Sequence, residues 1–237
     1  MNGIKGKINS IQSLGALDGP GIRFVVFMQG CNLRCGCCHN PDTWKSDGGT
    51  EYTPEEIVAK AVRYKEYFGN DGGITVSGGE PILQAEFVSE LFRLCHKKEI
   101  NTCLDTSGNI LNENIKVLLN ETDRVLLDLK YPTNKLYMKY AGCNLDNVLE
   151  FLEYLNSKSI PVTLRQVIIP SLNDNTENVL FLKQTAEKYP CIDKVELLPF
   201  KKICKVKYDK LGITFAFENL PEPDAQLMTK LNSILSE

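Results

Sequence analysis

Four cysteines and one histidine lie close together near the amino terminus, directly after a short apolar run. Cys31, Cys35 and Cys38 have the spacing C-x3-C-x2-C, and Cys37 and His39 stand beside them. Three thiolates on one compact loop can each bind one iron of a four-iron cluster, which leaves the fourth iron open. An open iron can bind a small molecule directly and pass one electron to it. The spacing therefore predicts a redox-active iron–sulfur site.

A structural zinc site is the alternative interpretation of this segment. Cys31, Cys35 and Cys38 would then complete a tetrahedron with either Cys37 or His39. Zinc sites of this kind usually combine two paired half-sites, and the sequence has no second C-x2-C pair elsewhere. The spacing therefore favours the cluster over zinc.

A glycine-rich segment, Ser77-Gly78-Gly79-Glu80-Pro81, follows the second predicted strand. Paired glycines let the backbone approach a ligand that any Cβ atom would push away. An ordinary strand-to-helix turn is the alternative interpretation. The residues by themselves leave both interpretations open.

Charged residues also end two later apolar runs, Asp105 with Thr106 and Asp128 with Lys130. A charge at the end of an apolar run is costly unless it is paired or functional. Asp128 and Lys130 share one face of a strand, so a solvated ion pair is the alternative.

Arg165 lies inside a further apolar run, where its planar guanidinium can hold a carboxylate or a peptide carbonyl. An exposed arginine on an edge strand is the alternative there.

Strands and helices must position these residues. Along the chain, short β-branched runs alternate with longer helical stretches, which is typical of a parallel sheet with crossover helices. The predicted strands span residues 22–28, 74–77, 101–105, 124–128, 162–168 and 194–198. Predicted helices lie near residues 84–98, 112–119, 145–158 and 176–188. Six strands with right-handed crossovers predict an α/β fold, an incomplete (β/α)6 TIM-like barrel whose strand ends line a common mouth.

The first helix has the clearest signals. Thr53 and Glu56 form a capping box, Pro54 suits the first helical position, and the apolar face continues to Phe68. Gly69 is its expected end. Before the first buried strand we expect an extended segment around residues 4–11.

The chain of 237 residues is 43% apolar and 24% charged, and a single domain over residues 1–237 is expected. A net charge of −3 gives no general attraction to nucleic acid.

The amino terminus lacks an export signal, and the longest early apolar run, Phe24–Met28, is too short to cross a bilayer, so we expect a cytoplasmic protein. Nine cysteines without an export signal favour metal or redox chemistry over a disulfide framework, with Cys95 and Cys103 as core residues.

The cysteine spacing after the first strand resembles that of the radical SAM superfamily. The segments Asp18-Gly19-Pro20-Gly21-Ile22-Arg23 and Cys38-His39-Asn40-Pro41-Asp42-Thr43-Trp44 are similar to those of the glycyl-radical-enzyme activating enzymes, most of all the pyruvate formate-lyase type. The resemblance runs from about residue 3 to Leu197-Leu198-Pro199-Phe200. An ordered set of motifs is more specific than three cysteines alone.

The resemblance implies roles for individual residues. One 4Fe-4S cluster would be held by Cys31, Cys35 and Cys38. S-adenosylmethionine (SAM) would be bound by Cys37, Cys38, His39, Gly78, Gly79, Glu80, Asp105, Asp128, Leu129, Lys130, Arg165 and Lys201. Asp18, near the mouth, and Arg165 would meet the substrate peptide, and a monovalent cation would lie at Asp105, Thr106 and Asp128. His39 and Trp44 can instead be explained by loop capping and packing.

The resemblance also implies an anaerobic reaction in which no side chain acts as a general acid or base. A flavodoxin or ferredoxin would reduce the cluster, and reductive cleavage of SAM would yield a 5′-deoxyadenosyl radical. That radical would take a hydrogen atom from a glycine of a partner glycyl radical enzyme, most simply a pyruvate formate-lyase. The protein would position the reactants and exclude water, and we expect a monomer.

Two positions depart from the family pattern. Cys37 stands where an aromatic residue is usual, and Lys201 stands where a histidine is usual. Residues 45–76 contain no cysteine, unlike the ferredoxin-like insertion of several other activating enzymes. Another radical SAM enzyme acting on a small molecule and a non-enzymatic zinc-binding module remain the alternatives.

Overall fold

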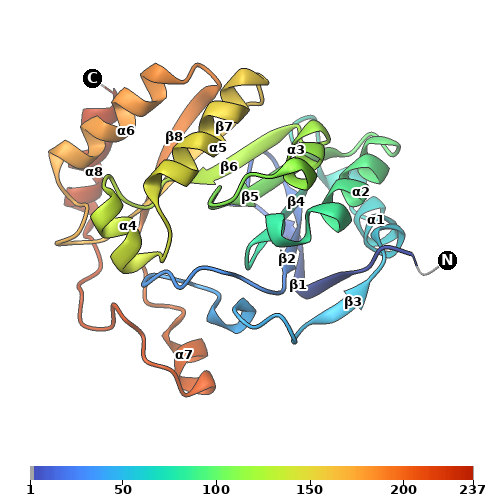
Figure 1. Cartoon of the computed structure of the whole chain (residues 1–237), viewed down its shortest axis with the longest axis horizontal. Helices are drawn as coiled ribbons and strands as arrows, with labels where there is room; N and C mark the ends of the chain where they lie inside the picture. Colours follow the sequence, from blue (N-terminus) through green and yellow to red (C-terminus); the bar gives the residue numbers. More distant parts are fainter. Residues whose placement is uncertain (1–2, 237) are drawn as a thin grey trace. The chain divides into compact units, whose positions relative to one another are not determined.

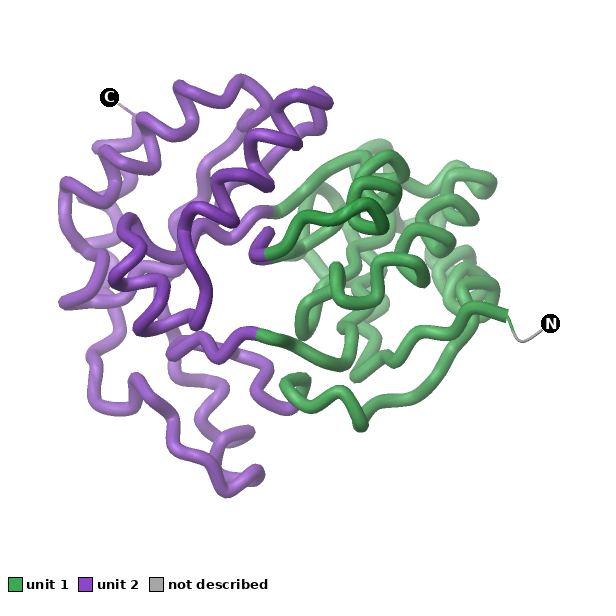
Figure 2. The backbone as a smooth tube through the Cα atoms, viewed as in Figure 1, with its two compact units in different colours: residues 1–32, 43–106, 110–126 green, residues 33–42, 107–109, 127–237 purple. Residues whose placement is uncertain are grey.

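The computed structural model describes residues 3–236 and divides the chain into two compact units (Figure 2). Unit 1 contains residues up to 32, 43–106 and 110–126. Unit 2 contains residues 33–42, 107–109 and those from 127 onward. Each unit is therefore built from segments that lie far apart in the sequence. The expected single domain over residues 1–237 stays a prediction.

In unit 1 the core of the sheet is parallel. Strand β4 (Gly73–Gly78) lies between β2 (Arg23–Met28) and β5 (Asn101–Thr106) and is parallel to both. Strand β1 (Gly6–Gly15) runs antiparallel to β2 and to β3 (Thr50–Tyr52), which confirms the expected extended segment. The apolar side chains of β2 and β4 are almost wholly buried, as expected for strands covered on both faces.

Three α-helices complete unit 1, namely α1 (Pro54–Val62), α2 (Ala85–His96) and α3 (Glu113–Asn120), with the short helix η3 (Pro81–Gln84) before α2. The capping box at Thr53 and Glu56 is confirmed, with both reciprocal hydrogen bonds present. The predicted length of this helix was wrong, because α1 ends at Val62 and the 3-10 helix η2 (Lys65–Tyr67) follows.

The shortening of α1 has a local cause. The amide of Tyr64 donates to the carbonyl of Ala61 at 2.9 Å, and the amide of Tyr67 donates to that of Tyr64 at the same distance. These bonds span three residues instead of four, so the chain tightens after α1. The tighter turns still bring Phe68 into the core before Gly69, whose φ of +59° ends the segment.

Unit 2 contains the end of β6 (Arg124–Asp128), which runs on from unit 1, together with β7 (Val162–Ile168) and β8 (Ile192–Pro199). Strands β7 and β8 are parallel. The helices of unit 2 are α4 (Asn134–Tyr140), α5 (Leu145–Ser157), α6 (Thr176–Lys188), α7 (Lys205–Leu211) and α8 (Ala225–Ser236), labelled in Figure 1. Helices α6 and α8 contact each other and β8.

The eight strands have the order β3-β1-β2-β4-β5-β6-β7-β8, which begins and ends at different strands and does not close among residues 3–236. The six predicted strands are β2 and β4 to β8, so the α/β fold with an incomplete barrel is confirmed. The sequence patterns did not predict β3, α4, α7 or α8. Across residues 3–236, no helix has the length and apolar character needed to cross a membrane.

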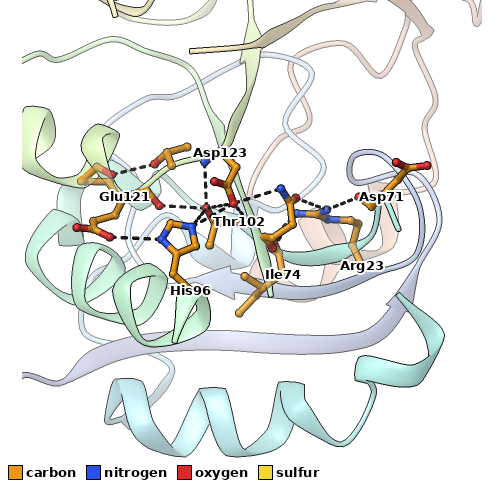
Figure 3. Close-up of polar contacts among 10 residues, drawn as sticks. Arg23, Asp71, Ile74, His96, Thr102, Glu121 and Asp123 are labelled. Carbon is orange, nitrogen blue, oxygen red and sulfur yellow. Dashed lines mark hydrogen bonds and ion pairs between the residues drawn. The ribbon is translucent and has the colours of Figure 1, made fainter. Parts of the chain in front are cut away.

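A fully buried arginine joins the amino-terminal ends of three strands in unit 1 (Figure 3). Arg23 opens β2, and its Nε donates to Thr75 Oγ1 at 3.0 Å. Its Nη1 donates to Asn101 Oδ1 at 2.8 Å, and its Nη2 donates to the carbonyl of Ile74 at 2.6 Å. Nη1 also reaches the carbonyl of Asp71 at 3.1 Å. The planar guanidinium thus satisfies acceptors on β4 and β5 that burial separates from water.

The same network continues beyond Asn101. The Asp123 carboxylate accepts hydrogen bonds from the amide of Thr102 at 2.8 Å and from Asn101 Nδ2 at 3.2 Å. The His96 ring lies between Asp123, at 3.1 Å, and Glu121, at 3.4 Å. A connected polar network therefore links the start of β2 to α2 and to the chain before β6.

Replacing Arg23 with Met is expected to lower the free energy of unfolding by at least about 3 kcal/mol, because several buried acceptors lose their donor at once. Urea unfolding followed by circular dichroism measures this change. Arg63→Met, at the exposed end of α1, is the control and is expected to change the unfolding free energy by less than about 0.5 kcal/mol. Equal, small effects in both variants would contradict a structural role for the buried network.

Candidate functional site

The cysteine loop (residues 29–40) leaves the carboxyl end of β2 and begins in unit 1. The amide of Gly30 donates to the carbonyl of Thr43 at 2.8 Å, and the amide of Cys31 donates to that of Trp44 at 3.4 Å. The buried side chain of Gln29 donates to the carbonyl of Lys45 at 2.6 Å. These bonds hold the backbone at Cys31 in place, and Trp44 takes part through its carbonyl group.

The next part of the loop belongs to unit 2 and is attached to the end of α4 (Figure 1). The amide of Arg34 donates to the carbonyl of Ala141 at 3.2 Å, and the amide of Gly36 donates to that of Tyr140 at 2.9 Å. A Cβ atom on Gly36 would lie 2.4 Å from the ring of Phe217, so any larger residue would require this ring to move. The backbone between Cys35 and Cys37 is therefore fixed by close packing.

Helix α7 and the residues before it hold the end of the loop. The hydroxyl of Tyr208 donates to the carbonyl of Cys38 at 3.1 Å, and Lys207 Nζ bonds Asn40 at 2.8 Å and Asp42 at 3.0 Å. The exposed His39 ring contacts the carbonyl of Lys201 at 3.0 Å. His39 thus caps the loop, as its alternative interpretation expected. Sequence patterns gave no signal for Tyr208 or Lys207, because only the packing of α7 brings them to the loop.

The sulfur of Cys38 has a polar environment suited to a thiolate. The amide of Asn40 donates to Cys38 Sγ at 3.4 Å, and hydrogen bonds from backbone amides stabilise negative charge on sulfur. Cys31, Cys35 and Cys38 are partly exposed residues, and so is Cys37. The chemistry of these three side chains fits an iron–sulfur cluster.

Cys37 has a different environment from its neighbours. Burial raises the pKa of its thiol to about 12, against the opposing effect of the Lys130 charge. The nearby groups of Cys35, Cys38 and Asp128 raise this pKa further. Cys37 is therefore a neutral thiol at physiological pH and packs in unit 2 beside the charged residues that follow β6.

Those charged residues form a partly buried ion pair. Lys130 Nζ lies 2.7 Å from Asp128 Oδ2, and their side chains are 17% and 31% exposed, so the pair is not the fully solvated one of the alternative interpretation. Burial by itself lowers the pKa of Lys130, but the charge of Asp128 and the thiol groups of Cys35 and Cys37 outweigh it, and the pKa rises well above its ordinary value. Lys130 therefore carries its positive charge at neutral pH.

Side chains hold the backbone of residues 128–130 where the strand ladder ends. The amide of Lys130 donates to Tyr137 Oη at 2.8 Å, and Tyr137 Oη donates to the carbonyl of Asp128 at 3.4 Å. Gln166 Nε2 donates to the carbonyl of Leu129 at 2.8 Å. Tyr137 and Gln166 are positioning residues that the sequence patterns did not single out. The sequence did contain one sign of this role for Gln166, because a polar glutamine interrupts the apolar run that forms β7.

Arg165 is buried on β7, and β7 lies between β6 and β8 in the sheet, so the alternative of an exposed edge-strand arginine is wrong. Its Nε donates to Glu196 Oε2 at 3.0 Å. Burial by itself raises the pKa of Glu196, but hydrogen bonds from Lys194 and Arg165 outweigh it and lower the pKa. The sequence patterns missed Glu196, because its pairing depends on the register of β7 with β8.

Close approach of the neighbouring backbone accounts for the presence of glycine at both positions of the glycine pair in unit 1. A Cβ atom on Gly78 would lie 2.4 Å from the amide nitrogen of Met28, and one on Gly79 would lie 2.2 Å from the carbonyl oxygen of Gly30. Gly78 also has a φ of +107°. The space next to both glycines is therefore filled by the end of β2, whereas the sequence interpretation assigned that space to a ligand. SAM binding by this segment stays a prediction.

Polar side chains gather in unit 1 at the carboxyl ends of β4 and β5. Glu80 is only 2% exposed, and its Oε1 accepts a hydrogen bond from Thr106 Oγ1 at 2.6 Å. Ser77 Oγ donates to Asp105 Oδ2 at 2.7 Å. A buried carboxylate held by a neutral hydroxyl can accept a cationic group such as an ammonium.

The side chains of Asp18 and Lys201 are the remaining candidates. The carbonyl of Asp18 accepts a hydrogen bond from Thr75 Oγ1 at 2.7 Å, and its loop leads into β2. Its position near the mouth stays a prediction. Lys201 is exposed, and its Nζ pairs with Glu222 at 3.0 Å. The roles of both residues stay predictions.

The candidate residues divide between the two units. Unit 1 contains Cys31, Gly78, Gly79, Glu80, Asp105 and Thr106, and unit 2 contains Cys35, Cys37, Cys38, His39, Asp128, Leu129, Lys130, Arg165 and Lys201. Among residues 3–236, no three His, Cys, Asp or Glu side chains are grouped so as to hold a single metal ion. The cation site at Asp105, Thr106 and Asp128 stays a prediction.

Comparison with known proteins agrees with the motifs. The model of the radical SAM superfamily matches residues 25–182. The chain is 40% identical to the pyruvate formate-lyase-activating enzyme of Clostridium pasteurianum over 235 residues, covering 99% of this chain and 98% of that protein. It is 39% identical to the pyruvate formate-lyase 1-activating enzyme of Escherichia coli (strain K12), covering 98% and 96% of the two chains.

A solved structure shares the fold. Streptococcus suis SuiB bound to the precursor peptide SuiA matches 95% of this chain and 46% of its own chain, with a TM-score of 0.71 and 16% identity. At this identity the likeness concerns the fold alone. The superfamily match and the near full-length similarity to the two activating enzymes show that the chain belongs to the radical SAM superfamily, in the family of the pyruvate formate-lyase-activating enzymes.

Proposed function

We propose that this chain activates a glycyl radical enzyme of the pyruvate formate-lyase type. The observation that carries the proposal is the loop of three cysteines after β2, fixed by backbone hydrogen bonds, in a chain similar over nearly its full length to activating enzymes. When bound, a 4Fe-4S cluster and SAM supply a 5′-deoxyadenosyl radical that takes a hydrogen atom from a glycine of the partner.

Cys31, Cys35 and Cys38 hold the cluster in this proposal. Their spacing and the amide bond to Cys38 Sγ support the assignment. Cys37 lies outside the C-x3-C-x2-C spacing and is not a ligand in this proposal. The electron comes from a flavodoxin or a ferredoxin.

Two side chains, the buried Glu80 and the partly buried Lys130, fit the charged groups of SAM. Glu80 presents a carboxylate that can accept hydrogen bonds from the amino group, and Lys130 presents a cation that can bind the carboxylate. Tyr137 and Gln166 orient Lys130 by holding the backbone around it. The chain's contribution is to bind and orient reactants, since no side chain has to move a proton.

Alanine at Cys31, Cys35 or Cys38 is expected to abolish the cluster, whereas Cys37→Ala is expected to retain it, because only the first three are ligands. Anaerobic reconstitution followed by iron and sulfide analysis and visible absorption measures the cluster. Cys37→Ala is the internal control for loop folding. A cluster that survives in Cys38→Ala and is lost in Cys37→Ala would overturn the ligand assignment.

Glu80→Gln is expected to weaken SAM binding by at least about tenfold with the cluster content unchanged, because glutamine keeps an oxygen for Thr106 but loses the charge that favours an ammonium. Equilibrium dialysis of SAM against the reconstituted protein measures the affinity. Glu86→Gln, which removes an exposed carboxylate of α2, is the matched control and should bind SAM like the unchanged protein. Equal affinities of all three proteins would remove Glu80 from the site.

The activity itself is tested anaerobically with the reconstituted protein, dithionite, SAM and a purified pyruvate formate-lyase. We expect both 5′-deoxyadenosine, measured by chromatography, and a glycyl radical, measured by electron paramagnetic resonance. 5′-Deoxyadenosine without the glycyl radical would reject this partner and keep the radical SAM chemistry. Neither product, in a protein with a complete cluster, would overturn the proposed function.

A further inference from the structure

Two adjacent residues of α7, Lys207 and Tyr208, hold the segment that begins with the last cysteine of the motif. Tyr208 Oη donates to the carbonyl of Cys38 at 3.1 Å. Lys207 Nζ donates to Asn40 Oδ1 at 2.8 Å and lies 3.0 Å from Asp42 Oδ1. Every second residue from 38 to 42 is therefore bound to α7, and all of these groups belong to unit 2.

Asn40 is bonded through both its backbone and its side chain. Its amide donates to Cys38 Sγ at 3.4 Å, and its side-chain oxygen accepts from Lys207 Nζ. Pro41 follows, and a residue before proline is kept out of helical backbone. With its side chain tethered as well, Asn40 has little freedom to turn its amide away from the sulfur. Lys207 thus acts on Cys38 through Asn40.

The position of Lys207 is itself fixed by packing and by an ion pair. The neighbouring Tyr208 is 2% exposed, and its ring packs against Phe215 with 4.7 Å between the centroids. The side chains of Lys207 and Asp42 are 37% and 34% exposed, so the pair is partly buried. Asp42 carries the opposite charge, so the pair adds little net charge beside the cysteine loop. The contribution of Lys207 is therefore chiefly one of position.

We propose that Lys207 is a positioning residue that, through Asn40, holds the N–H···S hydrogen bond to Cys38 and so raises the reduction potential of the cluster. The inference rests on the proposed ligation of the cluster by Cys38. One-electron reduction increases the negative charge on the ligand sulfurs, and a hydrogen bond donated to sulfur strengthens as that charge grows. A bond that is held in place therefore stabilises the reduced state.

Two substitutions break the tether from opposite ends. Lys207→Met removes the donor together with its charge. Asn40→Ala removes the acceptor but leaves the cation and the backbone amide at residue 40. Asn40→Ala therefore separates the effect of the tether from that of the charge. Lys210→Met is the control, because Lys210 is an exposed lysine in the last turn of the same helix.

The test compares these three variants and the Lys207→Met, Asn40→Ala double variant with the unchanged chain, all reconstituted anaerobically and checked for a full cluster by iron and sulfide analysis. A redox titration measures the midpoint potential. Electron–nuclear double resonance of the reduced cluster, in protein reconstituted in H2O or in D2O, measures its couplings to exchangeable protons.

Both single variants are expected to lower the midpoint potential by equal amounts and to weaken one exchangeable-proton coupling. The double variant is expected to shift the potential no further than either single variant, because the same bond is broken once. Lys210→Met is expected to match the unchanged chain in both measurements.

A lower potential in Lys207→Met with an unchanged potential and coupling in Asn40→Ala would overturn the inference, because the effect would then come from the charge. Unchanged values in both single variants, or an equal shift in Lys210→Met, would overturn it as well. A cluster that forms in the unchanged chain with any of these results leaves the proposed function in place. An unchanged chain that takes up no cluster contradicts both proposals.

Discussion

Hydrogen bonds and close packing hold the backbone of the cysteine loop in unit 2, and the positions of Cys35 and Cys38 depend on them. The amide of Gly36 donates to the carbonyl of Tyr140, Tyr208 donates to the carbonyl of Cys38, and Gly36 packs against Phe217. The short helices α4 and α7 supply these contacts, together with the chain that follows α7.

A second constraint arises where strands end. Beyond the last residue of β6 the backbone has no complete ladder, and buried amide and carbonyl groups need other partners. Tyr137 and Gln166 supply them at Lys130 and Leu129. The ion pair of Asp128 and Lys130 thereby stands on a backbone that these hydrogen bonds hold. The proposed role of Lys130 depends on this order, because a charge that is already positioned lowers the cost of ordering a site when a ligand binds.

In unit 1 the buried polar groups at the two ends of the parallel strands have separate partners. Arg23 opens β2 and satisfies acceptors near the amino ends of β4 and β5, so its hydrogen bonds stabilise the sheet. Glu80 lies beyond the carboxyl end of β4 and contacts Thr106, which ends β5. Parallel strands bring all their carboxyl ends to one edge, and the proposed role of Glu80 lies at that edge.

Local patterns in the sequence were sufficient for the six main strands, four of the helices, the capping box at Thr53 and the cysteine spacing, because each depends on residues close together in the chain. Only the tertiary structure decided the anchors Tyr208 and Lys207 and the pairing of Arg165 with Glu196. It also shortened α1. These features depend on contacts between residues far apart in the sequence, and burial and strand register become defined only when the chain packs.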